Sequence, residues 1–448
     1  FTVLAPASML WGQNTYVPDD NFEQALIDLG YDDTLDDYVL TANISGVTNL
    51  HVGSKEISDL TGIEDFIALT NLQCQGNQLT SLDVSNNTAL TLLKCDNGNQ
   101  ITSLDVSANT ALTSLDCSGN QITSLDVSAN TALTWLNCGD NQLTSLDVSS
   151  NTALTNLQCQ GNQLTSLDVS ANTSLTILNC GNNQLTSLDV SANTALNTLV
   201  CHENQLTSLD VSANTALGSF ECTANQITAL DLSNNTELSW FKCGGNQLTT
   251  LDVSANTALT ILEFYGNQLT SIDLSNNTAL TNLNCWSNSL TSLDVSANTA
   301  LTSLSCHDNQ LTSLDVSSNT ALSSFECTSN QITALDVSNN TELSWFKCGD
   351  NQLTSLDVSS NPNLTFLVCS HNQLTYLNMK NGLTDQLTNF YATGNSSLTC
   401  IETLDPDYAT ENWTNIDEGV TFDVICGAEA RTHWYVDTTG SDASGSGT

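Results

Sequence analysis

One internal repeat of 21 residues fills most of this chain and limits what it can fold into. Its marker is a single apolar position, which is Cys in fourteen repeats and Phe in one. Successive markers are 21 residues apart, except for one step of 22 residues between Cys95 and Cys117. Self-similarity at such a period indicates a solenoid of stacked coils. The marker residues are Cys74, Cys95, Cys117, Cys138, Cys159, Cys180, Cys201, Cys222, Cys243, Phe264, Cys285, Cys306, Cys327, Cys348 and Cys369.

Each repeat contains two similar halves, LTxLxCxxNQ (the Cys half) and LTSLDVSxNTA (the Asp half). Both fit the leucine-rich pattern L-x-x-L-x-L-x-x-N, and alternation along a strand places their Leu, Cys and Val side chains on one face. The Asn of each half is expected to bond the backbone of a turn, because an unpaired buried amide is costly. One coil cannot bury its own apolar face, whereas stacked coils can.

The predicted fold class is therefore a leucine-rich-repeat solenoid, mostly of parallel β-strands joined by short turns. Its two equal halves predict two parallel ladders, one through L-x-C and one through L-D-V. Because neither side of a coil is wider, we expect low curvature and a rod of roughly 75 Å for about sixteen coils.

The repeat resembles that of bacterial leucine-rich-repeat proteins with nested 21-residue units, sometimes called IRREKO repeats. The likeness is strongest to secreted, Cys-containing members from Bacteroidota, and it covers roughly residues 47–400. The resemblance implies a right-handed solenoid that is used for binding. It supplies no ligand.

Changes in composition divide the chain into five segments. The first is expected to be the remnant of a secretory signal peptide, with an ordinary apolar strand as the alternative. The last contains WYVDTTGSD, which resembles the opening of right-handed β-helix domains, with a flexible tail as the alternative. The segments are 1–13, the signal-peptide remnant; 14–46, an N-terminal helical cap; 47–386, the solenoid; 387–427, a C-terminal repeat and cap; and 428–448, a linker or the start of a truncated further domain.

A short helix is predicted over residues 18–30 in the N-terminal cap. Phe22, Leu26 and Leu29 share one stripe, and Gly30 is placed to end the helix. A solenoid end exposes apolar core, and a helix here is well placed to cover it.

Cysteine is unusually frequent, with 16 residues, of which fourteen lie at the repeat marker. We interpret these fourteen as small core residues. Adjacent coils would hold their Cβ atoms about 4.8 Å apart, whereas a disulfide needs about 3.8 Å and zinc needs ligands that converge. Cys400 and Cys426 lie outside the repeat, in the part that resembles a C-terminal cap. For them we predict a disulfide, with two free buried thiols as the alternative.

The charge balance is strongly acidic, with 6 Lys plus Arg against 48 Asp plus Glu and a formal net charge of −42. This excludes nucleic acid as a natural partner and disfavours an anionic membrane surface. No stretch reaches the length of apolar sequence that would span a membrane, and we expect a monomer.

One Asp per Asp half forms an outward column, the Asp ladder. We expect a solvated acidic face with diffuse counterions, while discrete calcium sites stay an alternative that one carboxylate per coil does not favour. No metal site or other cofactor is predicted. The ladder comprises Asp83, Asp105, Asp126, Asp147, Asp168, Asp189, Asp210, Asp231, Asp252, Asp273, Asp294, Asp315, Asp336 and Asp357.

The outward positions of the Cys half vary, unlike those of the Asp half. Directly before the marker stand Glu221, Lys242 and Glu263 in consecutive repeats, and Glu326 and Lys347 in two others. Opposite charges at the same position of neighbouring strands predict ion-pair ladders, Glu221–Lys242–Glu263 and Glu326–Lys347.

Aromatic residues interrupt this same half at two positions. Tyr265, Trp286 and His307 follow the marker directly in three consecutive coils. Exposed aromatic side chains on a rigid sheet are typical binding anchors, so we predict a ligand face here, with ring faces that stack on sugars or on partner side chains. The alternative is that these side chains only cover neighbouring coils. Three positions before the marker stand Trp135, Trp240, Trp345 and Phe366, which we assign to the same predicted ligand face.

The sequence predicts a non-catalytic binding protein, secreted or on the outer cell surface, with a protein or glycan ligand. No nucleophile and base, phosphate loop or carboxylate pair points to an enzyme. One alternative is an accessory module of a polysaccharide-active enzyme whose catalytic β-helix lies beyond residue 448. A minor alternative is ice binding by the Thr and Ser rows, against which the Asp ladder argues.

Overall fold

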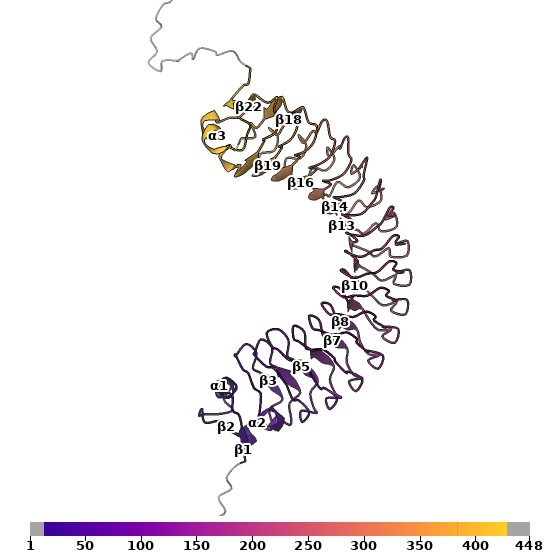
Figure 1. Ribbon diagram of the computed structural model, residues 1–448, viewed down its shortest axis with the longest axis vertical. Coiled ribbons are helices and arrows are strands. Elements are labelled where there is room, and N and C mark those ends of the chain that lie inside the picture. The colour runs from indigo at the N-terminus through magenta and orange to yellow at the C-terminus, as the bar shows by residue number, and fades with distance from the viewer. Residues whose placement is uncertain (1–12, 383, 428–448) are drawn as a thin grey trace, which may run out of the picture.

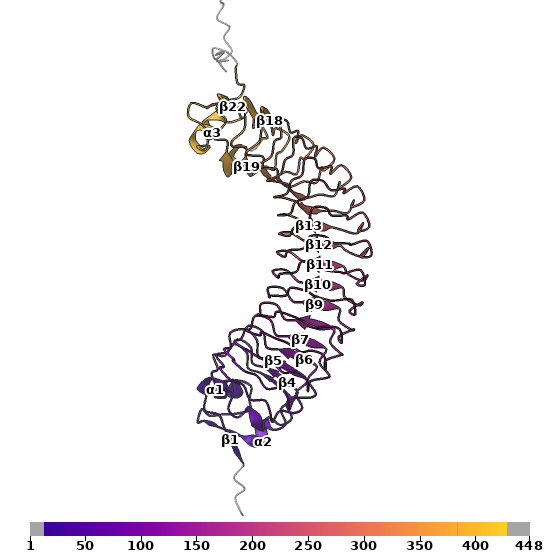
Figure 2. The ribbon, with the colours of Figure 1, turned by 45° about the vertical axis from the view of Figure 1, so that its right-hand side comes forward.

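The computed structural model describes residues 13–382 and 384–427. The predicted signal-peptide remnant, apart from Gln13, and the segment 428–448 lie outside the described residues. Figures 1 and 2 show the coils stacked into one continuous arc, with a small cap at each end.

The Cys halves form one long parallel sheet of seventeen strands. Each strand pairs with the next coil in register, so that Leu157 lies opposite Leu178, for example. The sheet is open, because β3 and β21 each have one strand partner among the described residues and lie at opposite ends of the arc. Its strands are β3 (Asn49–His51), β4 (Asn71–Gln73), β5 (Leu92–Lys94), β6 (Ser114–Asp116), β7 (Trp135–Asn137), β8 (Asn156–Gln158), β9 (Ile177–Asn179), β10 (Thr198–Val200), β11 (Ser219–Glu221), β12 (Trp240–Lys242), β13 (Ile261–Glu263), β14 (Asn282–Asn284), β15 (Ser303–Ser305), β16 (Ser324–Glu326), β17 (Trp345–Lys347), β19 (Phe366–Val368) and β21 (Asn389–Tyr391).

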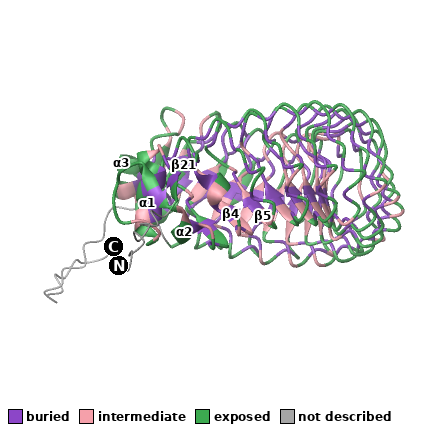
Figure 3. Ribbon diagram, turned by 90° about the horizontal axis from the view of Figure 1, so that it is seen from below, coloured by how far each residue is buried: buried purple, intermediate pink, exposed green. Residues whose placement is uncertain are grey.

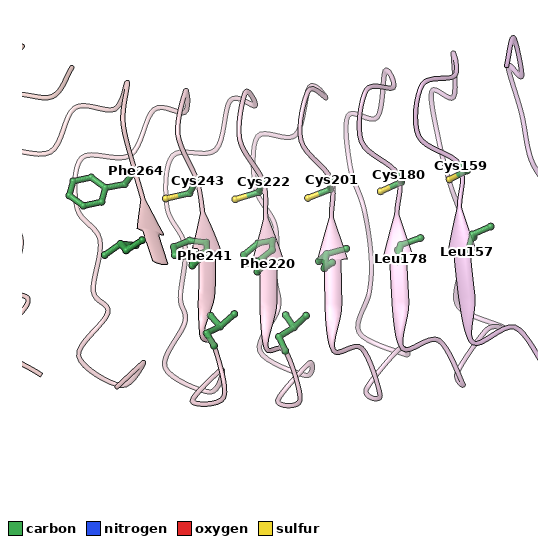
Figure 4. Close-up of a cluster of buried hydrophobic side chains, with 14 of the residues drawn as sticks. Leu157, Cys159, Leu178, Cys180, Cys201, Phe220, Cys222, Phe241, Cys243 and Phe264 are labelled. Atoms are coloured by element: carbon green, nitrogen blue, oxygen red, sulfur yellow. The ribbon is translucent and has the colours of Figure 1, made fainter. Parts of the chain in front are cut away.

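Alternation along each strand builds the core. In β9, Leu178 is fully buried between two partly exposed neighbours, and Cys180 is buried directly after the strand. Figure 4 shows the cysteines in one row and the leucines or phenylalanines in the next, with Phe264 taking the place of a thiol. The fourteen marker cysteines are free and buried, as the sequence predicts.

The Asp halves do not form the second continuous ladder that the sequence predicts. In the part of the chain that the structure describes, strands appear in this half only at the C-terminal end, where β18 (Ser355–Asp357), β20 (Tyr376–Asn378), β22 (Cys400–Glu402) and β23 (Thr421–Asp423) make a four-stranded sheet. Elsewhere the described Asp halves show one isolated bridge, between Asp83 and Asp105. The predicted orientation of the L-D-V side chains is correct nonetheless, since Val169 is buried and Asp168 is exposed.

The expectation of low curvature is wrong. Figure 1 shows the long sheet along the inner side of the arc and the loops of the Asp halves fanned out along the outer side. Strand pairing holds the inner sides of neighbouring coils about 4.8 Å apart, whereas most Asp halves lack such pairing and can spread. No long helix lies on the outer side within the described residues. Figure 3 shows exposed residues around this outer rim and buried residues inside the coils.

Buried asparagines connect neighbouring coils in both halves. In the Cys half, the Nδ2 group of Asn162 donates to the carbonyls of Cys138 and Cys159 at 3.0 and 3.1 Å, and its Oδ1 atom accepts from the amide of Leu143 at 2.9 Å. In the Asp half, Asn151 donates to the carbonyls of Val127 and Asn130, each at 2.9 Å. The Oδ1 atom of Asn151 has no hydrogen-bond partner among the described residues.

The N-terminal cap contains the predicted helix, α1 (Asp20–Asp28), together with β1 (Asn14–Tyr16), β2 (Tyr38–Leu40) and α2 (Thr41–Ile44). Asp19 caps α1 by accepting from the amide of Phe22 at 2.9 Å. Phe22 and Leu26 are buried, but Leu29 is 43% exposed and does not belong to the apolar stripe. Leu29 occupies the C-cap position of the helix, and a residue at the cap has left the buried face.

A 3-10 turn, η1 (Ile63–Asp65), lies in the opening coil, and a second, η2 (Thr384–Gln386), precedes the C-terminal cap with its helix α3 (Pro406–Asn412). A disulfide joins Cys400 to Cys426 where the sequence analysis expects one, with the Cα atoms 5.8 Å apart. Lys380 and Glu402 form an ion pair beside it. Trp413 packs on Phe390 and covers the end of the core.

Candidate functional ligand face

Three outward positions of each Cys half face the inner side of the arc. They are the first and third residues of the strand and the residue after the marker, because the residues between them point into the core. Each position forms a column that runs from coil to coil along the sheet. The variable residues of the sequence fall on these columns, whereas the Asp ladder lies in the other half.

Tyr265, Trp286 and His307 form one stack in the column after the marker. The centroids of Tyr265 and Trp286 are 4.7 Å apart with planes 4° from parallel, and those of Trp286 and His307 are 5.1 Å apart at 7°. Trp286 therefore has a ring against each of its faces. The predicted grouping of these three residues is present, but the expected open ring faces are not, because the coil spacing is also a stacking distance.

Glycine in the preceding coil seats the first ring of this stack. A Cβ atom on Gly244 would lie 2.6 Å from ring atoms of Tyr265, so the ring rests directly on the Gly244 backbone. His202 rests on Gly181 in the same way. Tyr265 and His202 thus lean toward the preceding coil, where a glycine leaves room for the ring.

Trp240 begins a second group one coil before the stack. The Lys242 ammonium lies 4.7 Å from the centroid of the Trp240 ring and 3.1 Å from a carboxylate oxygen of Glu263. The predicted pair between Lys242 and Glu221 is not formed, since the Glu221 carboxylate accepts from the Thr223 hydroxyl at 3.0 Å instead. A cation above an aromatic face and beside a carboxylate is neutralised locally.

Trp345 repeats this arrangement five coils later in a larger aromatic group. The Lys347 ammonium lies 4.4 Å from the Trp345 centroid and 3.5 Å from Glu326, which is the predicted pair. Phe366 stacks on Trp345 at 5.6 Å, and Tyr391 lies 6.3 Å from Phe366.

Sequence reasoning missed Tyr391, which is 37% exposed. It stands in the segment assigned to the C-terminal repeat and cap, and its coil follows a step of 23 residues from Cys369 to Ala392. Reading Ala392 as the marker of that coil would have placed Tyr391 on the third strand position, beside Val368.

Trp135 is not brought into either group. It lies in β7, five coils before Trp240, and within the described residues it has no aromatic or cation–π contact. At about 4.8 Å per coil the two indoles are roughly 24 Å apart.

Carboxylates of the Asp ladder accept hydrogen bonds from their own coils. The Oδ1 atom of Asp168 accepts from the amide of Ser170 at 2.9 Å, and this bond recurs along the column. Hydrogen bonds from the Ser170 hydroxyl and amide hold the pKa of Asp168 below its ordinary value. The described residues contain no group of three His, Cys, Asp or Glu side chains placed to hold a metal ion.

The marker cysteines are poor nucleophiles. Burial raises the pKa of the Cys180 thiol to about 12, and the thiolate is the reactive form of cysteine. Among the helices that the structure describes, none is long and apolar enough to cross a membrane.

Comparison with known proteins gives a consistent picture. A family model described as leucine-rich repeats (2 copies) matches residues 152–193. Internalin J of Listeria monocytogenes serotype 4b (strain F2365) is 41% identical over 75 residues, which is 17% of this chain and 8% of that protein. The chain therefore spans a small part of this curated relative.

Two solved structures are similar over most of the chain. The functional domain of internalin J from Listeria monocytogenes, described as including a cysteine ladder, has a TM-score of 0.75 and 37% identity, and the match covers 85% of this chain and 82% of that one. A leucine-rich-repeat protein of Leptospira interrogans has a TM-score of 0.67 and 22% identity over 82% of this chain and 98% of its own. The second likeness shows the fold alone.

Proposed function

We infer the function from the premise that this chain belongs to the bacterial leucine-rich-repeat proteins related to internalin J, which it matches at 37% identity over 82% of the solved domain. We propose that it is a non-catalytic binding protein on the outside of the cell and that its ligand is a protein held on the inner side of the arc. The fold is that of a family whose solenoids are used for binding. The Asp halves are nearly uniform along the chain, so they offer little to distinguish one ligand from another.

The observation that carries the proposal is where the aromatic side chains lie. The aromatic side chains of the Cys halves that are not buried in the core gather on the outward columns of one rigid, hydrogen-bonded sheet. Rings that are already stacked or held by a cation lose little conformational entropy when a ligand binds. Such anchors on a fixed surface favour recognition of a protein partner.

Two features weigh on the alternatives. A glycan usually stacks on free aromatic faces, and those of Trp286 are covered. Ice binding needs a flat, regular face, and both the arc and the Asp ladder count against it. We also propose that the N-terminal cap ends at residue 46 and that the C-terminal repeat and cap begin at residue 387.

A pull-down from the native surface tests the function. A partner recovered with the wild-type chain is purified and titrated against it, against a Tyr265→Ala, Trp286→Ala double variant, and against a His202→Ala, Gln160→Ala control. We expect the double variant to lose at least about tenfold in affinity, since anchor residues are worth 2 kcal/mol or more, and the control to bind normally. Equal affinity of the folded double variant would move the site away from the stack of Tyr265, Trp286 and His307.

A further inference from the structure

Four polar side chains lie between the pair Trp240–Lys242 and the pair Trp345–Lys347 without an internal hydrogen bond. Asn282 and Asn284 in β14 and Ser303 and Ser305 in β15 are partly exposed, and their side chains form no hydrogen bond within the described part of the chain. The Oδ1 atom of Asn284 is itself buried, so this side chain offers a ligand only its amide N–H groups. By contrast, Gln158 of β8 donates to Asn156 at 3.2 Å across the same two positions.

Aromatic groups surround these four residues on the sheet. Trp240 and Ile261 precede them in the first column, and Trp345 follows after Ser324. The stack of Tyr265, Trp286 and His307 runs beside them in the column after the marker. We call this surface, from β12 to β19, the aromatic face.

Among the described residues, the aromatic face has no lysine or arginine without a carboxylate partner. The Lys242 ammonium is paired with Glu263 and the Lys347 ammonium with Glu326, and each also lies over an indole ring. The whole chain carries a formal charge of −42. An acidic side chain on a ligand would lose hydration, find no cationic partner and be repelled by the surrounding field.

The covered ring faces of the stack favour a peptide over a sugar as the ligand. Trp286 is covered on both sides, and Tyr265 is covered by Trp286 and by Gly244, so sugar rings find no free face on these two residues. Main-chain amides alternate donors and acceptors, and Asn and Ser side chains supply both. From β12 to β19 the face spans six coil steps, roughly 29 Å, which an extended peptide of about nine residues covers.

We propose that the aromatic face binds an extended polypeptide segment that is free of acidic residues. This deepens the proposed function and rests on it. The main chain of the segment bonds Asn282, Asn284, Ser303 and Ser305, and its apolar side chains pack against Trp240 at one end and Trp345 with Phe366 at the other.

The test blocks the middle of the face with a side chain that the repeat already accepts. Ser303→Trp puts an indole at the first strand position, which naturally holds Trp135, Trp240 and Trp345 in other coils. Ser114→Trp makes the same change in β6, far from the aromatic face, and serves as the matched control. Circular dichroism confirms that both variants are folded.

A display library of random linear 12-residue peptides is panned against the full chain, and the same chain is applied to a glycan array. We expect enriched peptides that are poor in Asp and Glu. Ser303→Trp should weaken their binding by at least about tenfold, whereas Ser114→Trp should change it less than about twofold. One Glu placed in the middle of a bound peptide should weaken it more than one Lys does.

Four results would overturn the inference. Failure to enrich any peptide, or equal binding by Ser303→Trp, shows that no such segment binds here. Glycan binding that Ser303→Trp abolishes shows that the occupant is a sugar. Loss of binding in Ser114→Trp with retention in Ser303→Trp places the site elsewhere on the inner side, and the proposed function then stands without this inference.

Discussion

The two halves of a coil share one pattern, yet they behave differently in the folded chain. The Cys half pairs with its neighbours through seventeen strands, whereas the Asp half pairs continuously only through β18, β20, β22 and β23. The Cys half also carries the variable outward residues, and the Asp half carries the uniform Asp ladder. The half that is fixed by strand pairing is therefore the inner side of the arc, and it is the surface that we propose for ligand binding.

The buried asparagines should show this difference most strongly. Asn162→Ala leaves the Leu143 amide without its partner, and we expect it to lower the free energy of unfolding by about 3 kcal/mol. Asn151→Ala should lower it by about 1 kcal/mol, because the carbonyls of Val127 and Asn130 keep other donors and an unpartnered oxygen is removed. Urea unfolding followed by circular dichroism measures both. Equal losses would mean that the two halves hold the coils together equally.

Acid should lower the stability of the folded chain through the Asp half. The pKa of Asp147, Asp168 and Asp189 is lowered in the fold by the hydroxyl and amide of the following Ser. A lowered pKa gives stability that is present above the unfolded value, about 3.9, and is lost as pH falls through the folded value. We expect a lower urea midpoint at pH 3 than at pH 6. A flatter dependence should follow when Ser149, Ser170 and Ser191 become Ala, while Ser→Ala changes in the Cys half should leave the slope unchanged.

Salt should raise the stability of the folded chain through the same column of Asp residues. Asp126 and Asp168 each raise the pKa of Asp147 a little, because like charges repel along the ladder. Screening at about 500 mM NaCl removes most of this repulsion relative to about 10 mM, so we expect the thermal midpoint to rise by a few degrees. A triple Asp147→Asn, Asp168→Asn, Asp189→Asn variant should respond less. An unchanged midpoint in the wild type would show that the ladder is electrostatically silent.

Substitution of the glycine beneath the aromatic stack should have a smaller effect on stability, within the Cys half. In Gly244→Ser the new Cβ atom meets the Tyr265 ring, which must move off the Gly244 backbone and away from Trp286. We expect a loss of about 1 kcal/mol and a changed near-ultraviolet circular dichroism signal. Gly139→Ser is the control, since the flexible Gln160 side chain above it can turn aside. An unaltered aromatic signal in Gly244→Ser would argue against the stack.

Much of this molecule follows from sequence, because the repeat fixes which side chains enter the core. Burial of Cys180 and exposure of Asp168 could be predicted from alternation alone. Curvature could not, because it depends on whether extended L-D-V segments of neighbouring coils pair, and the pattern is the same whether or not they do. The covered faces of Trp286 were missed for a related reason: in-phase aromatic residues were expected to face the ligand, but at the coil spacing they stack on one another.

The direction of ion pairing is the finest difference, and it compares two nearly identical blocks of the Cys half. Lys242 pairs forward with Glu263, whereas Lys347 pairs backward with Glu326, because its forward neighbour is Val368. We expect a double-mutant cycle of Lys242→Met and Glu263→Gln to give a coupling of about 0.5 kcal/mol, as is usual for partly exposed pairs.

A second cycle sharpens the comparison by giving Lys347 the missing forward partner. Val368→Glu should draw the Lys347 ammonium away from Glu326, so the coupling between Lys347 and Glu326 should fall below that measured in the wild type. The same substitution should leave the coupling of Lys242 with Glu263 unchanged, since those residues lie several coils away and distant sites are additive. If Lys347 keeps its full coupling to Glu326 with a carboxylate at position 368, then its place over Trp345 fixes the ammonium, and the neighbouring charge does not choose the direction.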